Sequence, residues 1–270
     1  MRVQTEEWRR FIPGVRMYKG KKTLFYNGEN LWERNGDDLN GRPLIYDEEE
    51  REKWEVIIVL PGVEVIPECT FHWCTTIERV IMADTVKRIE DNAFCHCYRL
   101  VFVKLSRNLE FIGRWAFEDC VSLTSIFIPP SCQEIGTWAF DSCKKLIICN
   151  VPEYTRLGRY VFQNTALMKK SSIDFHENGD YDYENEEEAV RWVKSINIAE
   201  EFALHRACTS FNLLTEIIHP LVQCQGIKAM RMPNAIGITP SQYLAANPFA
   251  DISEKEIVNR YILDMMGEVF

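Results

Sequence analysis

The 270-residue chain lacks the features that mark exported and membrane-spanning proteins. It has no run of about 18 apolar residues, which excludes a membrane-spanning helix of ordinary length. No apolar segment follows the charged start, so a secretory signal peptide is not visible, and no Asn-x-Ser/Thr glycosylation site occurs. These absences predict an intracellular, cytoplasmic protein that has no membrane partner.

An excess of basic residues is also absent. The chain has 31 Lys and Arg against 40 Asp and Glu, for a formal net charge of −9. A protein that binds nucleic acid needs a broad cationic surface for the phosphates, so this balance predicts no nucleic-acid partner. With 46% hydrophobic and 12% aromatic residues, the chain can nevertheless bury a sizeable core.

Familiar catalytic and metal-binding motifs are missing as well. There is no P-loop, no nucleotide-binding glycine pattern, no Gly-x-Ser-x-Gly, no His-Glu-x-x-His and no Cys-x-x-Cys. The one dense group of metal-ligating types is Cys95-His96-Cys97, and neighbours that alternate faces would direct His96 away from both thiols. The sequence therefore predicts no catalytic residues, no cofactor and no metal site, with an enzyme built on Cys95 and His96 as the last-ranked alternative.

What the chain does have is an internal repeat of 23 residues. Several columns share this period without a slip over four units, and a further unit follows with one residue deleted. The columns are Cys74, Cys97, Cys120 and Cys143; Phe71, Phe94, Phe117 and Phe140; Ile66, Ile89, Ile112 and Ile135; and Ile57, Val80, Val103 and Ile126. Such spacing predicts five stacked units over residues 54–168.

The pattern within a unit indicates its architecture. Alternating apolar positions such as Leu123, Ile126 and Ile128 predict one short strand per unit, so stacked units form a parallel sheet on one side. The Ala-Phe-x-x-Cys turn packs a small residue, a ring and a thiol into the core on the other side. Because every unit directs its Cys the same way, we expect the thiols to fill a tight buried slot rather than to form disulfides.

Written out, one unit reads LTSIFIPPSCQEIGTWAFDSCKKL, from Leu123 to Leu146. It resembles the BspA-like class of leucine-rich repeats, whose unit has the form L-x-x-I-x-I-P-x-x-V-x-x-I-x-x-x-A-F-x-x-C. The outer units depart from this form, since Thr70 and Val161 replace the Ala and Thr165 replaces the last Cys. The resemblance implies a leucine-rich-repeat solenoid, with a parallel β-sheet on one side and turns on the other.

The flanking segments do not repeat. Residues 1–53 are predicted to cap the first unit, with a hairpin of 24–26 and 31–32 around Asn27-Gly28. Residues 169–188 hold eight carboxylates and read as an acidic linker, which ends where Asn185 and Glu188 have the character of a helix-capping box.

Residues 189–270 are predicted to form a helical, ankyrin-like tail. Leu204 to Cys208 resembles the first helix of an ankyrin unit, with His205 in the place of the histidine that hydrogen-bonds backbone, and Thr239-Pro240 resembles the opening of a next unit. Together with the repeats and the acidic linker, the C-terminal sequence is also similar to a large set of diatom leucine-rich repeat proteins. That similarity implies no established chemistry.

The outward strand positions carry the binding hypothesis. Six of the ten outward residues in the two columns 56–148 and 58–150 are apolar, which is more than a face that meets only water needs. These six form the predicted partner face: Val56, Ile58, Ile81, Phe102, Phe127 and Ile148. A second column, Trp115, Trp138 and Tyr160, precedes the Ala-Phe positions and reads equally as ring packing on a turn or as recognition.

These features predict a non-enzymatic scaffold that binds a protein partner through the sheet face. One alternative is a cell-surface or adhesion-type repeat protein, as some bacterial members of the repeat class are. A second is a structural protein whose sheet face is covered by its own helical tail. The sequence leaves the identity of the partner and the oligomeric state open.

Overall fold

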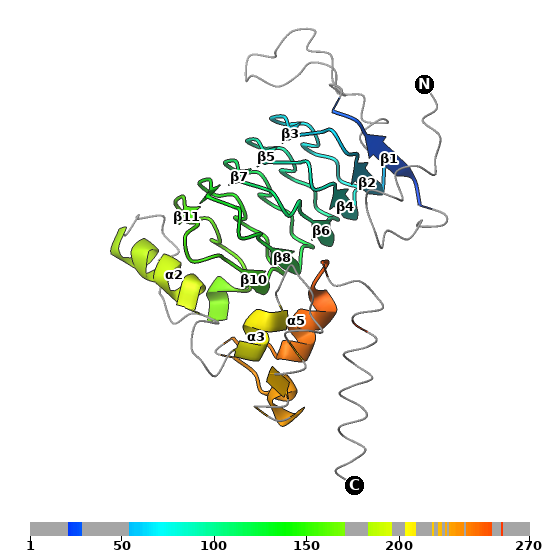
Figure 1. Ribbon diagram of the computed structural model, residues 1–270. Helices are drawn as coiled ribbons and strands as arrows, with labels where there is room; N and C mark the ends of the chain where they lie inside the picture. Colours follow the sequence, from blue (N-terminus) through cyan, green and yellow to red (C-terminus); the bar gives the residue numbers. More distant parts are fainter. Residues whose placement is uncertain are drawn as a thin grey trace.

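The computed structural model describes residues 21–28, 54–170, 183–195, 203–208, 218, 221–222, 225, 227–234, 236–249 and 255. Residues 54–170 wind into a β-solenoid whose repeat units stack along one axis (Figure 1). Most of the predicted cap (1–53), and parts of the predicted linker (169–188) and tail (189–270), lie outside the described residues.

One wall of the solenoid is built from one short strand per unit. These strands are β2 (Val56–Val59), β4 (Arg79–Met82), β6 (Phe102–Lys104), β8 (Ser125–Phe127) and β10 (Ile148–Asn150). Parallel ladders join β2, β4 and β6, and a separate parallel ladder joins β10 to β8. The register pairs Ile57 with Val80, and Val80 with Val103, so the 23-residue columns of the sequence are confirmed as columns of the sheet.

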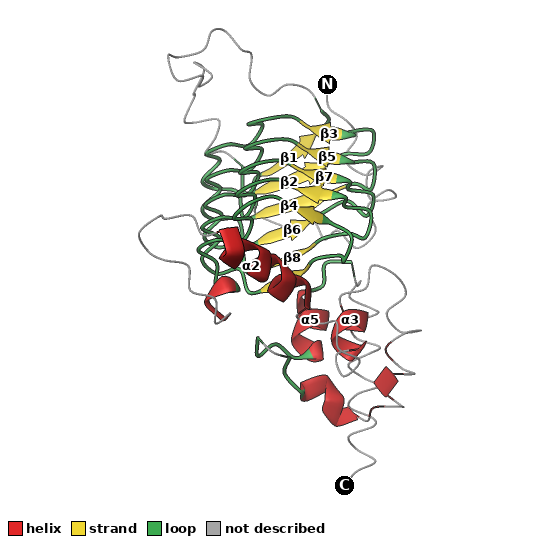
Figure 2. Cartoon of the chain, turned by 90° about the vertical axis from the view of Figure 1, so that its left-hand side faces the viewer, coloured by secondary structure: helices red, strands yellow, loops and turns green. Residues whose placement is uncertain are grey.

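The opposite wall holds a second parallel sheet that the sequence analysis did not predict. Its two-residue strands are β3 (Val65–Ile66), β5 (Arg88–Ile89), β7 (Phe111–Ile112), β9 (Glu134–Ile135) and β11 (Arg156–Leu157). Figure 2 shows the strands of both walls stacked in register. The prediction of one strand per unit was wrong because two residues are too few to display the alternation that indicates a strand.

A column of phenylalanine rings runs through the core. Consecutive rings stack with centroids 5.1–5.6 Å apart. The column consists of Phe71, Phe94, Phe117, Phe140 and Phe162. Each of the three inner rings therefore buries its faces against the units on either side, which no unit achieves alone.

The thiol column lies beside the rings and is buried, as predicted. The Sγ atoms of Cys97, Cys120 and Cys143 donate to the carbonyl oxygens of Phe71, Phe94 and Phe117 in the preceding unit, at 3.1–3.3 Å. The nine described cysteines are all free thiols. The slot therefore selects Cys for its size and also for a weak donor that bridges neighbouring units.

Strand β1 (Thr23–Tyr26) closes the first end of the solenoid. It pairs in parallel with β2, and the Tyr26 ring meets Phe71 edge to face at 5.3 Å. Residues 24–26 of the predicted hairpin form a strand that pairs in parallel with the first unit, and the other half of the hairpin, Leu31 and Trp32, lies outside the described residues. Because the first unit offers a free sheet edge, pairing with that edge satisfies backbone groups that would otherwise be unpaired.

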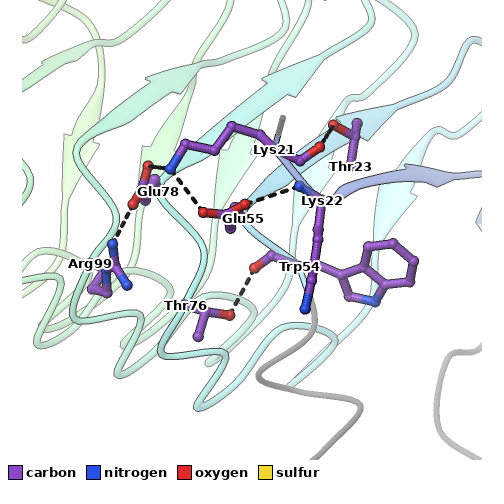
Figure 3. A network of polar contacts seen from close by, with 8 residues as sticks. All are labelled: Lys21, Lys22, Thr23, Trp54, Glu55, Thr76, Glu78 and Arg99. Carbon is purple, nitrogen blue, oxygen red and sulfur yellow. Dashed lines mark hydrogen bonds and ion pairs between the residues drawn. The ribbon is translucent and has the colours of Figure 1, made fainter. Parts of the chain in front are cut away.

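A network of polar contacts ties β1 to the first two units (Figure 3). Lys21 Nζ lies 2.8 Å from Glu55 Oε1 and 3.0 Å from Glu78 Oε2, and Arg99 pairs with the same Glu78 carboxylate. The Glu55 hydrogen bond raises the pKa of the Lys21 ammonium, and the same bond lowers the pKa of Glu55. These partly exposed ion pairs accompany the parallel pairing of β1 with β2, which sets the direction of β1, and add little stability of their own.

Helix α2 (Tyr183–Ser195) lies against the last unit, beside β11 (Figure 1). Lys194 Nζ donates to the carbonyl oxygens of Glu153 and Thr155, both at 2.8 Å, and Val193 is buried. The helix begins inside the segment that the sequence indicated as linker. Its early turns include Glu187 and Glu188, and carboxylates are favourable near a helix N-terminus.

The rest of the described tail is short helices. They are α3 (Ala203–Cys208), the 3-10 helix η4 (Ile227–Arg231) and α5 (Pro240–Ala246), after the 3-10 helix η2 (Met168–Lys170) that follows the last unit. Helix α5 begins after Thr239, whose side chain and that of Gln242 form a reciprocal capping box. His205 bonds backbone as predicted, through Nε2 to the Ile238 carbonyl oxygen at 3.0 Å.

A search of the described helices for candidate membrane spans finds none that is long and apolar enough.

Candidate functional site

The predicted partner face is largely covered. Four of its six side chains are buried, with exposed fractions of 1–3%, and the other two are half-buried. The buried four are Val56, Ile58, Ile81 and Phe127, and the half-buried two are Phe102 and Ile148. The structure therefore brings these residues together on one face, as the columns indicated, but does not leave that face open.

The tail contributes to this cover near β6 and β8. The Phe249 ring, just after α5, lies 5.9 Å from Lys104 Nζ and 5.8 Å from the Arg107 guanidinium, and it belongs to the same buried cluster as Phe127. Burial lowers the pKa of the Lys104 ammonium. In both views α5 lies next to β8 (Figures 1 and 2). Alternation predicts which way a side chain points, not what packs on top of it, and this explains the difference from the sequence analysis.

A different surface carries partly exposed aromatic rings. We call it the turn edge: the Ala-Phe-x-x-Cys turns at 69–74, 92–97, 115–120, 138–143 and 160–165. Trp115 and Trp138 stack with centroids 5.3 Å apart and planes 8° apart, and Tyr160 continues the stack at 5.8 Å. All three are half-buried. We call this column the aromatic stripe.

The backbone of the turn edge explains this display. Each turn has two residues with φ between 53° and 61°, in the left-handed region, although none is glycine. They are Cys69, Asn92, Trp115, Trp138 and Tyr160 in one column, and Trp73, His96, Asp119, Ser142 and Asn164 in the other. Because the same conformation recurs in every unit, it is a requirement of the turn rather than local strain.

The turn edge also gathers a cluster that the sequence analysis dismissed. One donor atom each from His72, Cys95 and His96 lies within 4.8 Å of the others. The expectation that His96 points away from Cys95 is wrong, because alternation holds for extended strands and His96 has a φ of 60°. We call these three residues the thiol–histidine cluster.

Carboxylates of the next unit border the cluster. Asp119 Oδ2 lies 3.2 Å from His96 Nδ1, and Cys95 Sγ donates to Glu118 Oε2 at 3.3 Å. Burial, together with the Glu118 charge, raises the pKa of the Cys95 thiol, and burial lowers the pKa of His96 against the opposing effect of Asp119. An activated thiol nucleophile needs a lowered thiol pKa beside a charged imidazole, and both shifts here run in the opposite direction.

Aromatic side chains enclose the same cluster. The Trp73 ring lies 4.3 Å from His96 and 5.7 Å from Tyr98, and the His72 ring stacks on His96 at 5.6 Å. His72, Trp73 and Glu118 were not predicted to be neighbours of Cys95. The repeat spacing could have indicated two of them, because His72, Cys95 and Glu118 stand 23 residues apart and so occupy one column of the solenoid.

Comparisons with known proteins define the class of the repeats. Residues 64–185 match, in six copies, the family described as "BspA type Leucine rich repeat region". Residues 64–185 are therefore similar to leucine-rich repeats of the BspA type, in agreement with the resemblance stated for the repeat. A search of curated proteins finds no significant match.

Solved structures of bacterial leucine-rich repeat proteins are similar to part of the chain. A Treponema pallidum protein is 30% identical, with a TM-score of 0.39, over 40% of this chain and 54% of that one. One from Bacteroides ovatus is 29% identical, with a TM-score of 0.40, over 46% of this chain and 35% of that one. A cell surface protein from Faecalibacterium prausnitzii is 29% identical, with a TM-score of 0.36, over 37% and 27%. This chain thus spans about half, or less, of these proteins.

Proposed function

We propose that the protein is a non-enzymatic protein-interaction scaffold that binds its partner through the turn edge. The observation that carries this proposal is the aromatic stripe, a stack of two tryptophans and a tyrosine that stays partly exposed. The sheet face is the weaker choice, because four of its six apolar side chains are buried. Tryptophan and tyrosine are also the residues most enriched where binding energy concentrates.

The charge of the turn edge indicates the chemistry of the partner. Residues 115–120 and 138–143 contain three carboxylates, Glu118, Asp119 and Asp141, and no Lys or Arg. Burial raises the pKa of both Glu118 and Asp141, so a cation placed beside them would relieve part of the cost of their charge. We propose a protein segment that sets Arg or Lys side chains against the aromatic rings and these carboxylates.

We expect the double substitution Trp115→Ala and Trp138→Ala to weaken partner binding at least tenfold, since buried aromatic anchors contribute roughly 2 kcal/mol each. The measurement is quantitative affinity capture from extracts of the native cells, at low and at high salt. Proteins whose capture depends on the aromatic stripe should also be lost at high salt, because salt screens the attraction between their cationic segment and the carboxylates of the turn edge.

Tyr154→Ala is the matched control, because Tyr154 is an aromatic residue outside the stripe and is 89% exposed. Unfolding curves of all variants separate lost binding from lost structure. The proposal fails if the folded double variant captures the same proteins, in the same amounts, as the wild type and Tyr154→Ala.

A second function rests on the Phe249 contacts. We propose that the tail also shields the sheet face from non-specific association. This corresponds to the second alternative from the sequence, a structural protein whose sheet face is covered by its own helical tail. The burial of Phe127 and the approach of Phe249 to Lys104 support this cover. A sheet face left open would be an apolar patch prone to self-association.

We also propose that the tail is ankyrin-like and that the protein is intracellular. An ankyrin-like tail is supported by the bond from His205 to the Ile238 carbonyl oxygen and by the capped start of α5. An intracellular location is proposed from the sequence alone. Similarity to the diatom set of repeat proteins rests on the sequence alone.

A further inference from the structure

We propose that the thiol–histidine cluster binds a zinc ion, with Cys95 Sγ and one nitrogen each of His72 and His96 as ligands. The three donor atoms already lie within 4.8 Å of one another. In a tetrahedral zinc site, with Zn–N of about 2.1 Å and Zn–S of about 2.3 Å, the donors lie about 3.5 Å apart. Side-chain movements of about 1 Å would therefore close the site.

The donor set favours zinc over other common cations. One thiolate with two imidazoles is a borderline-soft set, whereas magnesium and calcium require oxygen ligands. Three protein ligands leave a fourth position, which water or the nearby Glu118 carboxylate would take. On binding, the Cys95 thiol transfers its proton to solvent and the thiolate sulfur donates its electron pair to the metal.

Outer groups for such a site are also in place. Asp119 Oδ2 lies 3.2 Å from His96 Nδ1, which orients the ring and leaves Nε2 as the donor to zinc. This carboxylate–histidine–zinc arrangement is the usual support of a metal-bound imidazole. The rings of Trp73 and Tyr98 lie 4.3 Å and 5.8 Å from the His96 ring and restrict its movement.

The backbone holds the ligands at fixed separation, because they come from adjacent units joined by hydrogen bonds. Phe71 N donates to the Ala93 carbonyl oxygen at 2.7 Å, and Trp73 N donates to the Cys95 carbonyl oxygen at 2.9 Å. A zinc ion would thus staple the first unit to the second at the turn edge. The inference is independent of the aromatic stripe, which lies in later units.

The direct test is cobalt substitution of the full-length protein, prepared metal-free under reducing conditions. We expect one equivalent of Co²⁺ to produce a thiolate charge-transfer band and intense visible bands of tetrahedral cobalt, which one equivalent of Zn²⁺ abolishes and excess Mg²⁺ leaves unchanged. Cys95→Ala should remove the thiolate charge-transfer band. His72→Ala should remove the intense visible bands of tetrahedral cobalt. Cys132→Ala is the matched control, since it removes an equally buried thiol elsewhere on the solenoid.

Asp119→Asn tests the positioning role. We expect it to weaken zinc binding by roughly 10- to 100-fold while the cobalt spectrum keeps its thiolate band. Asp84→Asn, which removes a carboxylate at a different turn, should leave zinc binding unchanged.

Three results would overturn the proposal. The first is a wild-type protein that gives no thiolate-to-cobalt band. The second is a folded Cys95→Ala variant that binds zinc as tightly as Cys132→Ala. The third, which holds even where the Cys95 variant does not fold, is a His72→Ala variant whose zinc affinity and cobalt spectrum equal those of the wild type.

Discussion

Replacing Phe117 by Ala is expected to lower the free energy of unfolding by about 3–5 kcal/mol, the range for a large buried aromatic residue. Phe117 is fully buried and stacks on Phe94 at 5.1 Å and on Phe140 at 5.2 Å. The substitution leaves a cavity that backbone hydrogen bonds on either side prevent from collapsing. Equilibrium denaturation in urea, followed by circular dichroism, measures the change.

Phe162→Ala is the comparison at the end of the column. Phe162 stacks on one ring of the column, Phe140 at 5.6 Å, so its loss should cost about 1 kcal/mol less than the loss of Phe117. Tyr154→Ala, at an exposed position, should change stability by no more than about 0.5 kcal/mol. Equal losses for Phe117→Ala and Tyr154→Ala would contradict a core built on the ring column.

Gly136→Ala is expected to lower the free energy of unfolding by about 3 kcal/mol. The cause is overpacking, whereas Phe117→Ala leaves a cavity. A Cβ atom at Gly136 would lie 2.6 Å from Arg114 N and 2.7 Å from the carbonyl carbon of Gly113, both backbone atoms of the preceding unit. Neither atom can rotate away, so the two units must separate and weaken the hydrogen bonds between them. The same denaturation experiment measures the cost.

Glu90→Ala provides the matched control, because Glu90 occupies the same repeat column as Gly113 and Gly136 and already has a Cβ atom. It removes a partly exposed ion pair with Arg88 and should cost at most about 1 kcal/mol. If Gly136→Ala is as stable as Glu90→Ala, close backbone contact between units is not what selects glycine in this column.

The sequence predicted the structure best at positions where every repeat unit requires the same kind of side chain. Columns such as Ile57, Val80 and Val103 indicated the register directly, and the cysteine spacing indicated a buried slot, because one backbone geometry imposes one side-chain size at each position. The second wall was not predicted. Its two-residue strands form because the units stack, which places residues such as Ile66 and Ile89 side by side. This pairing does not depend on an alternation of apolar and polar residues within the unit.

The candidate sites were harder to predict because they depend on turns and on distant contacts. The thiol–histidine cluster requires a left-handed residue at His96, and no alternation rule for strands applies to such a turn. Phe249, which joins the same buried cluster as Phe127, lies 122 positions further along the chain (249 − 127). Periodicity within the repeats contains no information about where a non-repeating tail packs.

The ends of the solenoid follow a general requirement of repeat proteins. The terminal units would expose core side chains, so other elements must cover them. Tyr26 of β1 meets the Phe71 ring at one end, and Lys194 of α2 donates to the Glu153 and Thr155 carbonyl oxygens at the other. The described parts of the flanks, β1 and α2, therefore contact the terminal units where such a cover is required.

The central claim is that the aromatic rings of the turn edge stay partly open whereas Phe127 on the sheet face is closed, and hydroxyl-radical footprinting read by mass spectrometry tests it most directly. Trp73, which is 40% exposed, and the half-buried Trp115 and Trp138 should be oxidised readily in the folded protein. Phe127, at 1% exposed, should be oxidised only after unfolding. Oxidation of folded Phe127 at its unfolded rate, with Trp115 and Trp138 protected, would contradict the account.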